Sequence, residues 1–132
     1  MKTRLDLVHG WCRKADSDLA NLALCVNHEA ALDTACFHAQ QAAEKMLKAY
    51  LVDQGIEFPF VHNLEVLLKR CAEQESAFNE LLDEAVKLTP FAVGLRYDDE
   101  FWPSLNEVIE AQNAALKIRD FVIRRLDAGL RS

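Results

Sequence analysis

Glycine and proline are scarce in this chain of 132 residues, which has four glycines and three prolines. Every glycine is isolated, so the chain lacks the glycine-rich loops that hold the phosphates of nucleoside triphosphates or dinucleotides. Five of these seven residues separate long helical patterns; they are Gly55, Pro59, Pro90, Gly94 and Pro103. No segment alternates apolar and polar residues as a half-buried strand does. The sequence therefore predicts an all-α protein.

Long apolar runs are also missing. No stretch approaches the ~20 consecutive apolar residues that a transmembrane helix needs. Asp6 and His9 interrupt the N-terminal segment where a signal peptide would have its apolar core. We therefore expect a cytoplasmic protein without membrane contact.

Cysteine spacing gives no metal or disulfide framework. The four cysteines have no C-x-x-C spacing and fall at apolar helical positions, which favours reduced thiols in the core; they are Cys12, Cys25, Cys36 and Cys71. One spacing resembles that of a zinc motif, and it is formed by His9, Cys12, Cys25 and His28. On a continuous helix, however, the two cysteines would be about 20 Å apart, too far to share one ion. We expect no metal and no cofactor.

The chain has fewer basic than acidic residues, and its formal net charge is −6. A broad DNA-binding surface is therefore not expected, because phosphate binding depends on clustered Lys and Arg. The charge is uneven: residues 53–110 hold 13 acids and 4 bases, whereas residues 117–131 hold 2 acids and 5 bases. The basic segment is either a local binding patch or an ordinary helix end, where the helix dipole favours cations.

Five helical segments are predicted, over about residues 4–26, 33–54, the stretch after Asn63, 77–88 and 104–126. Asp33 is a candidate N-cap, and Ser104 with Glu107 forms a capping box. Leu82 and Val86 are predicted on the inner side of the fourth helix, and Leu116 on that of the last. We expect one domain spanning residues 1–132, an up-and-down antiparallel bundle of four to five helices.

Two of these helices have apolar residues off the main stripe: Phe37 and Leu51 on the second helix, Ile118 and Phe121 on the last. A helix that is apolar on more than one side packs against more than one neighbour. These residues either contact several helices within the bundle or form a homodimer or partner surface.

The second helix also carries more polar chemistry than packing requires. Four side chains recur at three- and four-residue steps on one side of it: His38, Gln41, Lys45 and Lys48. Arg96 and Tyr97 follow in a connector, where an arginine can bind phosphate and a tyrosine can stack on a base. Together these six residues are a candidate nucleotide or RNA site.

The same polar residues also have an ordinary structural interpretation. Lys48 is spaced to pair with Glu44 on the same helix, and Arg96 is followed by three acids, Asp98, Asp99 and Glu100. On this interpretation the polar residues are solvated surface charges.

The chain resembles the HEPN domain family over nearly its whole length. The resemblance is carried by the run AQQAAEKMLKAYL at residues 39–51, Gly55, the segment VHNL at 61–64, Arg96-Tyr97 before a capped last helix, and ADSDLA at 15–20. It implies a four- or five-helix bundle, commonly homodimeric. Many bacterial members are encoded beside a minimal nucleotidyltransferase and act with it, often as a toxin–antitoxin pair.

The resemblance also implies what an active site would need. Active members of the family are metal-independent ribonucleases in which four to six residues separate an Arg from a following His. Arg96 stands at the arginine's place, but Phe101, Trp102 and Pro103 stand where the histidine would be, and no histidine follows His62. The resemblance thus favours a non-catalytic module that binds a nucleotide, RNA or a nucleotidyltransferase partner. Two alternatives remain: a ribonuclease in which His38 or His62 supplies the proton, and a purely structural dimerisation bundle.

Overall fold

The computed structural model describes residues 1–58, 60–92 and 99–126, and every secondary-structure element within them is helical. The elements in chain order are α1 (Arg4–His28), α2 (Leu32–Asp53), α3 (Leu64–Gln74), the 3₁₀ helix η1 (Ser76–Leu81), α4 (Leu82–Leu88), the 3₁₀ helix η2 (Thr89–Phe91) and α6 (Leu105–Ile123). The all-α prediction is confirmed.

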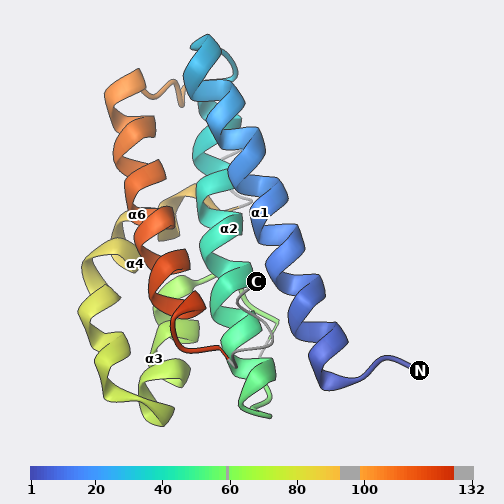
Figure 1. Cartoon of the computed structure of the whole chain (residues 1–132). Coiled ribbons are helices and arrows are strands. Elements are labelled where there is room, and N and C mark those ends of the chain that lie inside the picture. Colours follow the sequence, from blue (N-terminus) through green and yellow to red (C-terminus); the bar gives the residue numbers. More distant parts are fainter. Residues whose placement is uncertain (59, 93–98, 127–132) are drawn as a thin grey trace.

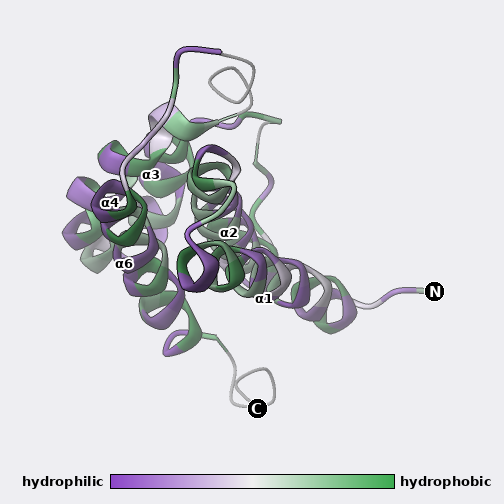
Figure 2. Ribbon diagram, turned by 90° about the horizontal axis from the view of Figure 1, so that it is seen from above, coloured by the Kyte–Doolittle hydropathy of each residue, from purple (hydrophilic) through white to green (hydrophobic). Residues whose placement is uncertain are grey.

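The helices form an antiparallel up-and-down bundle with α2 at its centre. α1 and α2 run in opposite directions as a long hairpin, and α6 lies along α2 and descends with it (Figure 1). Seen from above, α3 and α4 lie on the side of the bundle away from α1, with α2 and α6 between (Figure 2). Because α2 contacts α1, α3, α4 and α6, it has little exposed surface.

Side-chain caps begin three of the helices. Thr3 and Asp6 form a capping box at α1, and Ser104 and Glu107 form the predicted one at α6. The side chain of Asn63 accepts a hydrogen bond from the backbone N–H of Glu65 at the start of α3. Local sequence thus determines where these helices begin.

The hairpin between α1 and α2 is tighter than predicted. Glu29 and Ala31 adopt left-handed φ angles of 48° and 52°, and Ala31 is the N-cap of α2. Asp33 is therefore not the N-cap; it lies in the first turn, where its negative charge still favours the helix dipole. Gly55, with φ 72°, ends the helix, and the Ile56 N–H bonds back to the carbonyl of Leu51.

Residues off the main apolar stripes pack within the bundle. Leu51 and Ile118 are fully buried, and Phe121 is 6% exposed. Phe121 packs edge-to-face on Phe78 with 4.9 Å between ring centroids, and Phe78 contacts Tyr50 at 4.4 Å. These three residues are therefore buried within the bundle, as the first of the two alternatives predicts.

The fourth helix differs from the prediction. Residues 76–81 form a 3₁₀ helix, and only residues 82–88 are α-helical. A 3₁₀ helix has 3.0 residues per turn rather than 3.6, so it shifts the phase of every side chain that follows. Leu82 and Val86, predicted to face inward, are 49% and 48% exposed, whereas their neighbours Leu81 and Ala85 are fully buried, so the buried stripe of this segment is narrower than predicted. Leu116 is also exposed, on the outer side of α6.

α1 is unbroken from Arg4 to His28, so Cys12 and Cys25 are held about 20 Å apart and cannot share a zinc ion. All four cysteines are free thiols. Within the residues that the structure describes, no helix combines the length and the apolar character that a membrane crossing requires.

Candidate functional site

Polar side chains are buried on the face of α2 that meets α1 and the connector before α3. The buried polar and charged residues of the described chain are Asp18, Gln40, Glu44, Lys48 and Asp53. Burying such groups is unfavourable unless hydrogen bonds and opposite charges compensate. Four of these five belong to two adjacent networks, each centred on one carboxylate.

Asp18 of α1 is the centre of the first network. One oxygen of its carboxylate lies 2.9 Å from Nδ1 of His38, and the other accepts a hydrogen bond from Nζ of Lys45 at 2.5 Å. Burial raises the pKa of Asp18, but the hydrogen bonds from His38 and Lys45 and the lysine charge outweigh it, so the pKa lies below its usual value. Asp18 is thus an anion that holds two α2 side chains against α1.

Glu44 of α2 is the centre of the second network. Its Oε1 accepts from the Gln40 amide at 3.1 Å and lies 3.0 Å from Nδ1 of His62, while Oε2 accepts from Nζ of Lys48 at 3.0 Å. Gln40 also donates to the backbone carbonyl of His62 at 2.9 Å. Gln41 joins the network by donating to the amide oxygen of Gln40 at 2.7 Å. The network therefore attaches the connector at His62 to α2.

Aromatic rings enclose the ammonium of Lys48. Its Nζ lies 5.4 Å from the ring centroid of Trp11 and 5.5 Å from that of Phe58, and the two rings meet edge-to-face at 6.3 Å. Such cation–π contacts supplement the pairing with Glu44. Only 8% of the Lys48 side chain is exposed, so this lysine offers little of its charge to a ligand.

The structure brings four of the six predicted site residues to one face. His38, Gln41, Lys45 and Lys48 all lie on the side of α2 that carries the two networks. Arg96 and Tyr97 lie outside the described residues. Both lysines are paired with carboxylates, as the structural interpretation expected for Lys48 and Glu44, and so the charges of Asp18, Glu44, Lys45 and Lys48 sum to zero. The α2 face presents hydrogen-bonding groups without an excess of positive charge.

The carboxylates themselves were not among the predicted site residues. Asp18 could have been identified, because it falls three residues after Ala15 and four before Leu22, both of which are fully buried on α1. A lone acid on an apolar stripe indicates a buried partner. Gln40 and His62 gave no such signal, since their contacts depend on how the connector folds back.

The orientation of the two histidines has chemical consequences. In each case a carboxylate at Nδ1 favours the tautomer that carries its proton there, and Nε2 is then the nitrogen with the lone pair. This is the arrangement in which an imidazole accepts a proton from a bound group. No group of His, Cys, Asp and Glu in the described part of the chain is arranged to hold a metal ion.

The C-terminal basic segment is largely compensated. Lys117 pairs with Glu84 at 2.9 Å, Arg119 with Asp16 at 2.9 Å, and Arg125 with Glu75. Arg119 thereby ties α6 to α1. These pairs support the interpretation of the segment as an ordinary helix end.

Fold and site together define a small helical bundle with a buried polar network on its central helix. The chain belongs to the HEPN domain family, whose model matches residues 8–126. The crystal structure of ST0689, an archaeal HEPN homologue, superposes with a TM-score of 0.74 at 26% identity, covering 96% of this chain and all of that one. The crystal structure of TT1696 from Thermus thermophilus superposes with a TM-score of 0.79 at 27% identity, covering 90% of this chain and 98% of that one. No curated protein matches the chain.

Proposed function

We propose that this protein is a non-catalytic HEPN module that binds a nucleotide or RNA at the polar face of α2. His38, Gln41, Lys45 and Lys48 would form the floor of the site, and Arg96 and Tyr97 are proposed as its further binding residues. The observation that supports this most strongly is the burial of Asp18, Gln40, Glu44 and Lys48 where α2 meets α1 and the connector before α3.

Stability alone does not explain that burial. Buried ion pairs are often replaceable by apolar residues without loss of stability, so their presence is a pointer to function. α2 contacts four other helices and is otherwise a suitable place for apolar side chains. The networks instead hold histidine, glutamine and lysine groups in fixed positions at the edge of the bundle. Fixed hydrogen-bond donors of this kind suit a phosphate or a nucleobase.

We further propose that the protein is a cytoplasmic homodimer that acts with a minimal nucleotidyltransferase, in a toxin–antitoxin-like pair. This part of the proposal rests on membership of the HEPN family together with the sequence features described above. Co-expression with a minimal nucleotidyltransferase encoded beside this chain's gene, where one is found, followed by size-exclusion chromatography, tests it. A stable complex is expected, and separate elution of the two proteins at micromolar concentration would contradict the partnership.

Two measurements on purified protein test the binding module. Total cellular RNA in EDTA should remain intact, with Arg96→Ala as the comparison. Thermal melting with a panel of nucleotides should show a shift for at least one of them, because a ligand that binds only the folded state raises its stability. The shift should shrink in Lys45→Gln and persist in Lys69→Gln, an exposed lysine on α3. Absence of any shift in the wild type would contradict nucleotide binding.

One observation favours a second candidate, the ribonuclease that lacks the usual histidine after Arg96. His38 and His62 are each oriented by a carboxylate, as a general acid or base requires. RNA cleavage in EDTA that is lost in both Arg96→Ala and His38→Gln would establish this candidate in place of the binding module.

A further inference from the structure

The connector between α2 and α3 crosses the second network as a strap, defined here as residues 57–58 and 60–62. These residues form no helix or strand. The strap is anchored at both ends, because the N–H of Ile56 bonds to the carbonyl of Leu51 and Asn63 caps α3. Movement of the strap is therefore confined to the residues between these two anchors.

A buried ion pair lies beneath the strap. Glu44 is 3% exposed and Lys48 is 7% exposed, and their charged groups are 3.0 Å apart. The ring centroid of Phe58 lies 5.5 Å from Nζ of Lys48, and His62 faces the Glu44 carboxylate at 3.0 Å. On the other side, Trp11 of α1 lies 5.4 Å from the same ammonium. The burial of the ion pair thus depends on the strap as well as on α1.

Few interactions hold the strap in place. Among the residues that the structure describes, no backbone–backbone hydrogen bond joins it to another segment. Its hydrogen bonds to α2 in the described chain are that from the Gln40 amide to the carbonyl of His62 and that between His62 and Glu44. Segments with few backbone hydrogen bonds open at a lower free energy than the core does. The strap can therefore lift while the helices on either side stay intact.

The two phenylalanines of the strap lie in different surroundings. Phe58 packs edge-to-face on Trp11 with 6.3 Å between the ring centroids, and it is partly buried. Phe60 is 100% exposed. The strap therefore offers a matched pair of phenylalanines, one that contacts α1 and one that lies in solvent.

We propose that the strap is a gate, closed in this structure, that opens locally and uncovers Lys48 and Glu44 while the helices stay folded. The role of this gate rests on the proposed binding function, which assigns Lys48 to the floor of the site although its ammonium is enclosed by Trp11 and Phe58. A ligand contacts that ammonium only in the open state. The population of the open state therefore sets the apparent affinity.

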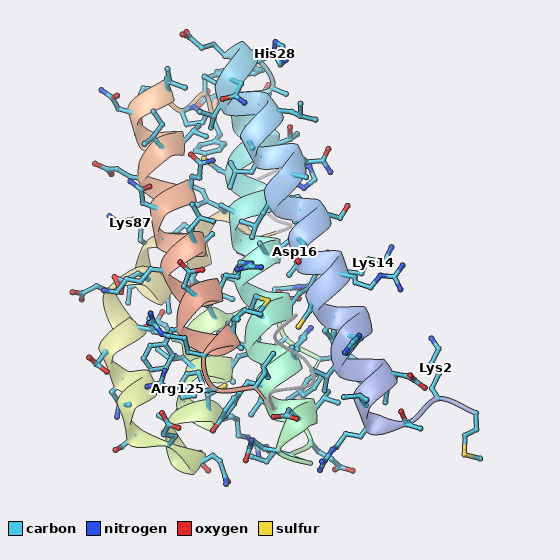
Figure 3. The ribbon with its side chains drawn as sticks, viewed as in Figure 1. Lys2, Lys14, Asp16, His28, Lys87 and Arg125 are labelled. Carbon is cyan, nitrogen blue, oxygen red and sulfur yellow. The ribbon has the colours of Figure 1, made fainter. Side chains whose placement is uncertain are left out.

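Acetylation of lysines in the native protein measures the opening. The reagent is the N-hydroxysuccinimide ester of acetic acid, and mass spectrometry identifies the modified residues. Lys14, which projects from α1 into solvent, gives the rate for a fully accessible lysine (Figure 3). Cys71 is fully buried, so its alkylation by iodoacetamide reports global unfolding.

Each rate is divided into the rate of the same residue in guanidinium chloride, which gives a protection factor. Lys48 should be protected more than Lys14, because the strap is closed most of the time. We expect its protection factor to be at least about tenfold below that of Cys71, because local opening requires less free energy than unfolding does.

His62→Ala distinguishes movement of the strap from the loss of a direct contact with the lysine. The side-chain hydrogen bond that it removes is to Glu44 and not to Lys48. We expect Lys48 to be acetylated about threefold faster in this variant, a small factor because the His62 side chain is 56% exposed. The protection factor of Cys71 should not change. The control is His9→Ala, an exposed histidine on α1, which should change the Lys48 rate by less than about twofold.

Phe58→Ala removes the apolar contact of the strap with α1. We expect it to speed the acetylation of Lys48 by about tenfold, because it removes both the aromatic pair with Trp11 and one wall around the ammonium. Phe60→Ala is the matched control on the same strap and should have an effect of less than about twofold.

The outcomes separate the gate from the binding function. Equal protection factors for Lys48 and Cys71 would overturn the gate, since only unfolding would then expose the lysine. A Lys48 rate that is unchanged in His62→Ala would also overturn it. A strap that opens as expected, in a protein that neither adenosine 5′-monophosphate nor adenosine 5′-triphosphate stabilises against melting, would confirm local opening and count against the proposed nucleotide binding. A nucleotide that binds the wild type should bind His62→Ala about threefold more tightly, because more molecules are open; unchanged or weaker binding would overturn the gating role.

Discussion

Asp18 of α1 and Lys45 of α2 form an ion pair with 2.5 Å between the carboxylate oxygen and Nζ. The two residues are 27 positions apart in the chain, and the side chains are 10% and 21% exposed. His38 shares the same carboxylate through its other oxygen. One acid therefore links the two longest helices of the bundle at two points.

Removing that acid should destabilise the fold. Asp18→Asn leaves Lys45 and His38 without a negative partner in a mostly buried position. Breaking a surface ion pair costs less than about 1 kcal/mol, and breaking a fully buried one costs about 3–5 kcal/mol. Because the Asp18–Lys45 pair is partly buried, we expect a loss of about 2 kcal/mol in the free energy of unfolding. For a chain of this length that lowers the melting temperature by on the order of 5–10 °C.

Asp16→Asn is the matched control for denaturant unfolding. Asp16 also pairs with a cation on another helix, Arg119, but it is 53% exposed, so its loss should change the stability by less than about 1 kcal/mol. Equal effects of the two substitutions would show that the Asp18 network adds nothing beyond an ordinary surface pair.

The same carboxylate predicts a pH dependence. Its pKa in the folded state lies below the value of 3.8 that it has when unfolded. The stability that it contributes is therefore fully present above pH 3.8 and is lost as the pH falls through the lower folded value. Melting temperatures of the wild type and Asp18→Asn should differ most above about pH 5 and converge toward about pH 2. A difference that stays constant over this range would contradict the assignment of the lowered pKa.

Burial also predicts how the thiols react. It raises the pKa of Cys12 to about 11 and those of Cys36 and Cys71 to about 12. At about pH 8 these cysteines are thiolate in at most about one molecule in a thousand, and the thiolate is the reactive form. We expect a thiol reagent to modify the fully buried Cys36 and Cys71 only at the rate of unfolding, and all four cysteines to react at once in guanidinium chloride. Rapid modification of Cys36 or Cys71 in the native protein, identified by mass spectrometry, would contradict this packing.

The sequence predicted the helices better than the site because helix ends depend on neighbouring residues. Ser104 with Glu107, and Asn63 before α3, act within one turn of their own helix; the structure confirms the predicted capping box and shows that Asn63 caps α3. The 3₁₀ segment of residues 76–81 was not predicted, since it depends on packing against α3 rather than on its own residues.

The site could be predicted only in part. The spacing on α2 correctly placed His38 and Lys45 on one face. The four-residue spacing also predicted Glu44 as the partner of Lys48, but not Asp18 as the partner of Lys45, because Asp18 lies across the hairpin on α1. The predicted site on α2 thus contains two lysines whose charges are paired with carboxylates.

Glu44 supplies the most demanding test of the second network. It is 3% exposed and accepts hydrogen bonds from Gln40 and Lys48 while facing His62. Glu44→Gln leaves the ammonium of Lys48 buried without a counter-charge, so we expect a loss of about 3–5 kcal/mol in the free energy of unfolding. Lys48→Met should lose less, because the carboxylate keeps two other partners and methionine fills the space between the aromatic rings.

A double-mutant cycle separates the charge pair from the packing around it. With both substitutions present no buried charge remains, so the double variant should be more stable than the sum of the two single losses predicts, by about 1–3 kcal/mol. Urea unfolding of the four proteins at neutral pH gives this coupling directly. A coupling near zero would mean that Lys48 reaches solvent when Glu44 is absent, and that the aromatic rings of Trp11 and Phe58 do not confine it.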